Sequence, residues 1–154
     1  EFYGPSEEQL KDNIGDDSLY QKVSDSFQIN GRIPQKDVYS KIADADFTFF
    51  LREKRKSSDA GFPTKLAESM AVGTPVMTNS TGSIGCYLQD GENGFLLPEL
   101  TVTCIVRALN RIRNLDKEEY LQMRRNARHT AEMHFDYRNY SKELNRFFTE
   151  GQNG

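Results

Sequence analysis

The stretch from Phe47 to Val76 constrains the fold more than any other part of this chain. It opens with the apolar run Phe47–Leu51, which is short and rich enough in β-prone residues to form a strand buried on both faces. A polar and strongly basic loop follows over Arg52–Ala60. After it, Pro63 fits the first turn of a helix whose apolar residues suit one helix side. The stretch therefore predicts a strand, a loop and a helix in this order.

This helix is expected to end at Gly73, because glycine readily adopts the left-handed conformation that terminates helices. Thr74-Pro75 then leads into a second strand over Val76–Thr78, which completes a parallel βαβ unit. Other patterns extend the alternation on both sides of this unit. Strands are predicted at 2–4, 27–29 and 95–97, and helices after the capping pair Ser6 and Gln9, over Ser18–Val23, from Pro34 toward Ala45, and near Ile84–Leu88.

The loop after the first strand and the start of the following helix form a candidate anion site. In open α/β sheets this place faces the crevice where ligands bind. Unpaired backbone N–H groups and the helix dipole favour a phosphate there. A solvated basic loop before an ordinary crossover would explain the same charges. The residues concerned are Arg52, Lys54, Arg55 and Lys56 in the loop, and Gly61, Thr64 and Lys65 at the helix start.

Two strings resemble the donor-side signature of glycosyltransferase family 4, the group 1 transferases of GT-B architecture, in a bacterial polysaccharide-biosynthesis branch. They are GFPTKLAESMAVGTPVMTNSTGS at 61–83 and DGENGFLL at 90–97. In that family two glutamates frame the helix start, and Glu68 matches the second, which contacts the ribose of the nucleotide. The first falls on Ala60, so the chain departs from the pattern for the donor sugar, and Asp59 is out of register.

The resemblance also implies roles for other residues around the donor. Gly61, Phe62 and Thr64 would surround the sugar and diphosphate, while Arg32 and Ile33 would lie beside the nucleobase. Arg52 and Lys65 are our own inference from charge, as groups that would neutralise the diphosphate. A plain strand-to-helix turn at 31–33 stays open as the alternative for the nucleobase residues.

The resemblance implies transfer of a sugar from a nucleotide diphosphate-sugar to a glycan or lipid-linked acceptor, with retention of configuration and with neither a metal nor another cofactor. The acceptor would bind to the protein's own amino-terminal domain, which this sequence lacks, so this fragment alone is expected to be inactive. Two alternatives stay open. One is a non-catalytic Rossmann-like nucleotide-binding or regulatory domain, which the alanine at position 60 favours, and the other is a nucleotide-sugar epimerase of the same fold.

Composition limits the other possibilities. The 154 residues carry a net charge of -3 and contain no run of eighteen apolar residues, which argues against nucleic acid as a partner and against a membrane span. Neither Cys86 with Cys104 nor His129 with His134 has the spacing of a metal site. We expect reduced thiols in a cytoplasmic protein without a signal peptide. The full-length protein could associate with the inner face of the membrane.

The fold class follows from the alternation of strands and helices, which predicts an α/β, Rossmann-like parallel sheet covered by helices. We expect residues 1–154 to form a single nucleotide-sugar-binding domain in which 101–150 are covering helices. By the resemblance this is the carboxyl-terminal half of a GT-B fold that lacks its first strand and helix. Because that strand would be central in the sheet, we expect a rearranged sheet or a paired dimer. We also expect Tyr137–Phe148 to expose apolar surface.

Overall fold

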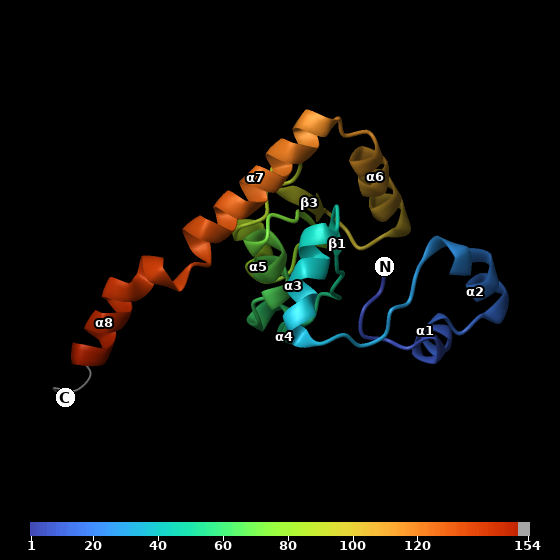
Figure 1. The fold of residues 1–154 in the computed structure, drawn as a ribbon, viewed down its shortest axis with the longest axis horizontal. Coiled ribbons are helices and arrows are strands. Elements are labelled where there is room, and N and C mark those ends of the chain that lie inside the picture. Colours follow the sequence, from blue (N-terminus) through green and yellow to red (C-terminus); the bar gives the residue numbers. More distant parts are fainter. Residues whose placement is uncertain (151–154) are drawn as a thin grey trace. The chain divides into compact units, whose positions relative to one another are not determined.

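A computed structural model describes residues 1–150, with the exception of the side chains of Ser57 and Glu150. The chain divides into two compact units, Glu1–Ser40 and Lys41–Gly154, whose last four residues lie outside the described part. The prediction of a single domain over 1–154 stays a prediction. Each unit is described by itself below, and Figure 1 gives the labels of the elements.

The first unit contains α1 (Glu7–Ile14), α2 (Asp17–Val23) and the short 3-10 helix η1 (Ser24–Ser26). The predicted capping box is confirmed, because the Ser6 side chain accepts from the backbone N–H of Gln9 and the Gln9 side chain accepts from that of Ser6. The two predicted strands of this unit are wrong as full strands. They meet in one parallel bridge between Phe2 and Ile29, and the pairing does not continue past Gly4 because the Ser6 N–H bonds to the Gln9 side chain.

The second unit is built on three parallel strands in the order β1-β2-β3. They are β1 (Thr48–Phe49), β2 (Val76–Asn79) and β3 (Gly94–Leu97). This confirms the predicted α/β class with a parallel sheet, and the described residues contain no six-stranded sheet. The dimer offered as one alternative stays a prediction.

Among the described residues, eight α- and 3-10 helices accompany this sheet, and α3 (Gln35–Asp44) begins in the first unit and ends in the second. The others are α4 (Lys56–Ala60), α5 (Thr64–Ala71), η2 (Ile84–Cys86), α6 (Val102–Arg113), α7 (Lys117–His134), η3 (Tyr137–Tyr140) and α8 (Ser141–Glu150). Figure 1 shows α5 alongside the long helix α7, and these two helices pack on each other.

Two clusters of buried side chains hold the second unit together. Leu66 and Met70 of α5 pack with Val76 of β2 and with Ala127 and Ala131 of α7. In the other cluster, Met77, which follows Val76 in β2, packs with residues of β3, α6 and α7. These are Phe95, Leu97, Ala108 and Met123. Because successive side chains of a strand point to opposite faces, β2 supplies both clusters and is buried along its whole length.

Two predictions for the stretch after residue 47 are wrong. The run Phe47–Leu51 is not buried on both faces, because β1 lies at the edge of its sheet and leaves Phe49 52% exposed. The segment Arg52–Ala60 is not wholly a loop, since the N–H groups of Ser58 and Asp59 bond to the Arg55 carbonyl and form the short helix α4. The predicted end of α5 is confirmed, with Gly73 at a φ of +74°.

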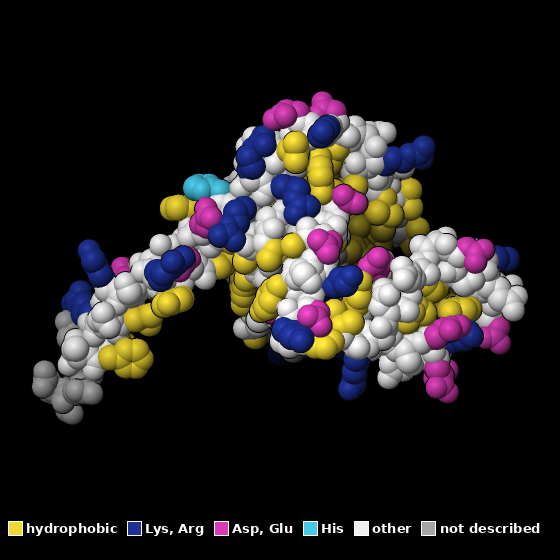
Figure 2. Space-filling model, in the orientation of Figure 1, with side chains coloured by type: hydrophobic (Ala, Val, Ile, Leu, Met, Phe, Trp, Pro, Cys, Tyr) yellow, Lys and Arg dark blue, Asp and Glu magenta, His cyan; other side chains and the backbone are white. Residues whose placement is uncertain are grey.

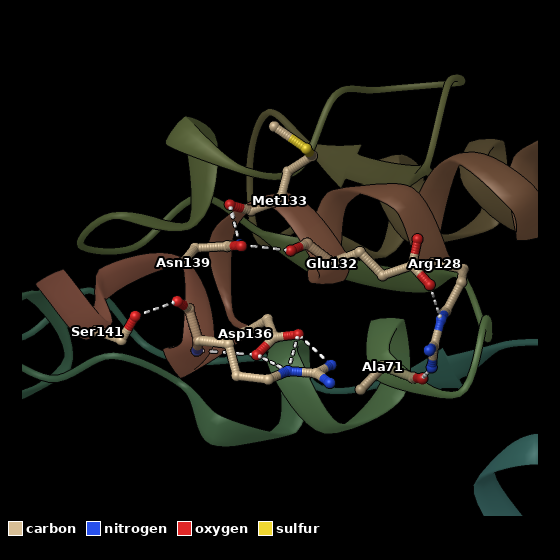
Figure 3. Close-up of polar contacts among 8 residues, drawn as sticks. Ala71, Arg128, Glu132, Met133, Asp136, Asn139 and Ser141 are labelled. Carbon is tan, nitrogen blue, oxygen red and sulfur yellow. Dashed lines mark hydrogen bonds and ion pairs between the residues drawn. The ribbon is translucent and has the colours of Figure 1, made fainter.

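Arginines of α7 hold the ends of two other helices. The Arg124 guanidinium donates to the carbonyls of Ala43 and Ala45, both at 3.1 Å, where α3 ends. Arg128 donates in the same way to the carbonyl of Ala71, the last residue of α5 (Figure 3). Terminal carbonyls have no partner within their own helix, so these side chains satisfy acceptors that would otherwise depend on water.

Replacing Arg124 with methionine is expected to lower the free energy of unfolding by about 1–2 kcal/mol, because its bonds to the two carbonyls and to the Tyr120 hydroxyl are lost while the apolar stem is kept. Chemical denaturation followed by circular dichroism measures the change. Arg125 is the matched control, since within the described residues its guanidinium bonds only to Gln122 and Glu118 on its own exposed helix face. An equal loss of stability in the two variants would contradict the capping role.

The end of α7 is closed by polar side chains of the following turn. Asn139 donates to the carbonyls of Glu132 and Met133 at 2.7 and 3.1 Å, and Figure 3 shows it reaching back over the helix terminus. The Arg138 guanidinium and backbone N–H bond to Asp136 and lower the pKa of that carboxyl to about 2. These contacts satisfy carbonyls at the end of α7 and hold the start of η3.

The predicted apolar surface near the carboxyl end is confirmed. Figure 2 shows hydrophobic side chains along one side of the segment formed by η3 and α8. Tyr137, Phe147 and Phe148 are 74%, 73% and 65% exposed. None of the helices in residues 1–150 combines the length and the apolar character of a membrane span.

Candidate functional site

An open hollow of about 330 Å³ lies where β1 ends and α5 begins. The carboxyl end of β1 supplies one wall and the turn before α5 supplies the other. The residues that line it are Phe50, Leu51, Arg52, Phe62, Pro63, Thr64 and Lys65. The structure thus brings four of the predicted donor residues together at the place where parallel α/β sheets bind ligands.

The amino end of α5 offers free hydrogen-bond donors to this hollow. Pro63 precedes the helix and no side chain caps it, while the N–H of Leu66 already bonds to the Pro63 carbonyl at 3.0 Å. The backbone N–H groups of Thr64 and Lys65 have no backbone partner within the described residues. Together with the dipole of the eight-residue helix, they favour an anion in front of the helix end.

Two cationic side chains add to this field. The half-buried Arg52 donates to the carbonyl of Gly61 at 3.3 Å, which places its guanidinium along the same edge of the hollow. Lys65 is exposed and has no ion pair within residues 1–150. Because neither charge is neutralised by a carboxylate of the described chain, both are available to an anionic ligand.

Glu68 lies one helical turn beyond Thr64 and therefore on the same side of α5. Its side chain is half-buried, and the structure gives it no hydrogen bond or ion pair among the described residues. A carboxylate that is held by a helix and left without a partner can accept hydrogen bonds from ligand hydroxyls. This arrangement is compatible with the predicted ribose contact, which stays a prediction.

Gly61 and Glu68 lie outside the lining, whereas Phe62 lines the hollow and also packs against other aromatic rings. Gly61 contributes its carbonyl to Arg52, and the ring of Phe62 packs against Phe135 and Tyr87 with ring centroids 5.3 and 5.7 Å apart. Arg32 and Ile33 belong to the first unit. Their predicted contact with a nucleobase stays a prediction.

The departure at Ala60 has a structural counterpart in Asp59. Its carboxylate is already engaged, because Oδ1 accepts a hydrogen bond from the backbone N–H of Gly82 at 3.0 Å. Gly82 has a φ of +54°, and a Cβ there would lie 2.9 Å from the Asp59 carbonyl oxygen. Asp59 therefore joins α4 to the loop that follows β2.

Sequence reasoning missed one buried polar residue beside the hollow. Asn79 lies just beyond the predicted strand Val76–Thr78, but it is the last residue of β2 and only 6% exposed. Its side chain accepts from the N–H of Arg52 at 2.9 Å and donates to the carbonyl of Arg52 at 2.8 Å. An asparagine directly after an apolar strand could have suggested such a contact, but its partner is 27 residues away.

Polar side chains hold the turn before β3 in place. Asp90 forms an ion pair with Arg111 at 2.8 Å, and the buried Asn93 bonds to Tyr87, Gln89 and Thr130. Within residues 1–150, no group of three histidines, cysteines or carboxylates has the arrangement of a metal site.

Comparison with known proteins identifies relatives over most of the chain. The family described as "Glycosyl transferases group 1" matches residues 2–130. WcaL of Escherichia coli (strain K12), named as a glycosyltransferase of colanic acid biosynthesis, is 29% identical over 144 residues, or 92% of this chain. The amylovoran biosynthesis glycosyltransferase AmsK of Erwinia amylovora is 31% identical over 71% of this chain. The chain spans 34% and 26% of the lengths of these two relatives.

Solved structures share the fold at low identity. Sucrose-phosphate synthase from Thermosynechococcus elongatus has a TM-score of 0.75 and 18% identity, over 96% of this chain and 36% of its own. HepE of Anabaena, solved with UDP and glucose, has a TM-score of 0.72 and 18% identity, over 96% of this chain and 39% of its own. The fold is that of the GT-B glycosyltransferases. Since the family match covers most of the chain, this chain belongs to the group 1 glycosyl transferases.

Proposed function

We propose that this chain is the donor-binding domain of a glycosyltransferase that moves a sugar from a nucleotide diphosphate-sugar to a glycan or lipid-linked acceptor. The observation that carries the proposal is the hollow at the uncapped start of α5, where two free N–H groups and the side chains of Arg52 and Lys65 converge. A diphosphate is the part of such a donor that requires this concentration of positive charge.

The relatives support this choice of reaction and donor. Both are named as glycosyltransferases of polysaccharide biosynthesis. HepE was solved with UDP and glucose, and the pneumococcal O-GlcNAc transferase GtfA with UDP and GlcNAc. These complexes favour a nucleotide-sugar as the partner of this site. Family membership favours sugar transfer over a purely regulatory domain.

In the proposed reaction the bond between the anomeric carbon of the sugar and the diphosphate oxygen breaks, and negative charge develops on the departing diphosphate. Arg52, Lys65 and the amino end of α5 would stabilise this charge. Glu68 would accept hydrogen bonds from the ribose hydroxyls and fix the orientation of the nucleotide. Arg32 and Ile33 are proposed as nucleobase contacts from the family resemblance alone.

The acceptor would bind to another domain of the full-length protein. In this proposal transfer retains the configuration of the sugar and uses no metal, as the resemblance implies. The protein would act in the cytoplasm, at the inner face of the membrane when the acceptor is lipid-linked.

Calorimetry of the full-length protein against UDP, GDP and their sugar conjugates tests the proposal. One nucleotide is expected to bind, and Glu68→Ala should weaken it about tenfold, the typical effect of losing a charged hydrogen bond. Glu99→Ala removes an exposed carboxylate outside the hollow and serves as the control. Binding of neither nucleotide by the wild type would overturn the proposal, and equal binding by wild type and Glu68→Ala would remove the ribose role.

A further inference from the structure

We propose that Asn79 is a positioning residue for donor binding and that it acts through Arg52. This inference rests on the proposed function, because it concerns the same hollow. Asn79 is absent from the lining of that hollow, and its side chain is fully engaged with the backbone of another residue.

The contact replaces a rung of the sheet. The ladder between β1 and β2 continues past Phe49, where the N–H of Phe50 bonds to the Met77 carbonyl at 3.3 Å. Two residues later the backbone of Arg52 bonds to the side-chain amide of Asn79 instead, through both its N–H and its carbonyl. A side-chain amide has the donor and acceptor of a peptide group, so it can extend the pairing where the strands themselves separate.

These two hydrogen bonds hold the backbone of Arg52 in place, and with it the Cα from which the side chain starts. With both backbone groups of Arg52 bonded, the direction in which its side chain leaves the β1 exit is set, and the guanidinium reaches the Gly61 carbonyl at the edge of the hollow. The Asp59 contact with Gly82 restrains the far part of the same segment. The segment 52–59 is therefore joined at two points to the end of β2 and the loop after it, at Asn79 and at Gly82. Such preorganisation lowers the cost of ordering a charged side chain when the ligand binds.

Asn93 provides a matched control. It is also buried and also accepts from one backbone N–H, of Gln89, and donates to one carbonyl, of Tyr87, each at 2.8 Å. It lies in the turn before β3 and outside the hollow. Replacing Asn93 should therefore lower the stability of the protein, as the loss of any buried amide does, without changing the hollow.

The test measures binding of UDP and GDP by the full-length protein carrying Asn79→Ala, Asn79→Asp or Asn93→Ala. Asn79→Ala should raise the Kd of the nucleotide that binds about tenfold. Asn79→Asp keeps the acceptor for the Arg52 N–H and loses the donor, so we expect an intermediate Kd. Asn93→Ala should leave the Kd of the folded protein within about twofold of the wild type.

A double-mutant cycle shows whether Asn79 acts through Arg52. In an Arg52→Ala background, Asn79→Ala should change the Kd by less than about twofold, because the side chain that it positions is gone. A readout without ligand is the rate of tryptic cleavage after Lys54, Arg55 and Lys56, which should rise in Asn79→Ala and stay unchanged in Asn93→Ala.

The outcomes separate the two proposals. A wild type that binds nucleotide, together with an unchanged Kd in Asn79→Ala or fully additive effects in the cycle, overturns the positioning role alone. A wild type that binds neither nucleotide overturns the proposed function and this inference with it.

Discussion

Replacing Gly94 with alanine is expected to lower the free energy of unfolding by about 3 kcal/mol, at the upper end of the usual cost of overpacking a core. Gly94 begins β3 and pairs with Val76 in the middle of the sheet. A Cβ at this position would lie 2.4 Å from the Val76 carbonyl oxygen and 2.7 Å from Cδ1 of the buried Leu88. Backbone of a central strand cannot move aside without breaking the ladder, so the added methyl group must separate β2 from β3.

Chemical denaturation, monitored by circular dichroism, measures this change. Gly85→Ala is the matched control, because Gly85 is exposed, and the nearest atom to its added Cβ is the Ser80 hydroxyl at 3.7 Å. We expect the control to retain nearly all of the stability. A Gly94→Ala protein as stable as the Gly85→Ala protein would mean that the two strands are not in such close contact.

Removing both cationic side chains of the hollow, with Arg52→Ala and Lys65→Ala together, is expected to weaken binding of the nucleotide diphosphate about a hundredfold, or about 3 kcal/mol. Each side chain would make charge-assisted contact with the diphosphate, and neither is neutralised by a carboxylate of the described chain. Calorimetry with UDP and GDP in the full-length protein measures the loss.

The control changes the net charge by the same amount at another place. Arg107→Ala with Arg113→Ala removes two exposed cations from α6 and should leave the Kd nearly unchanged. If the control pair weakened binding as much as the hollow pair, a general electrostatic attraction would account for the result. Binding that is insensitive to both pairs would contradict the placement of the diphosphate at the start of α5.

Much of the local structure could be predicted because its causes are local. The Ser6 capping box, the end of α5 at Gly73 and the strand that starts at Val76 depend on residues a few positions apart. The position of the candidate site could be predicted in the same way, since ligands of open α/β sheets bind at the carboxyl ends of the strands, next to the start of the following helix. Arg52, Phe62, Thr64 and Lys65 do line one hollow.

The failures have a different origin. Whether Phe47–Leu51 is buried depends on its place in the sheet, and the edge position of β1 leaves Phe49 open to solvent. The strand at residues 27–29 reduces to one bridge because its partner segment soon enters the capping box of α1, where the Ser6 N–H bonds to Gln9. A run of β-prone residues indicates that a strand can form, but it does not indicate how many strands will pair with it.

The sequence by itself determined the alternation of strands and helices, the group 1 glycosyltransferase resemblance and the basic site at the start of α5, because each is carried by residues close together in the chain. Only the tertiary structure decided which polar groups meet across long separations. In the tertiary structure Asn79 bonds to the backbone of Arg52, Asp59 bonds to Gly82, and Arg124 bonds to the end of α3. The same packing leaves no room for a side chain at Gly94. These contacts depend on how parallel strands and their covering helices pack, a property that no local pattern contains.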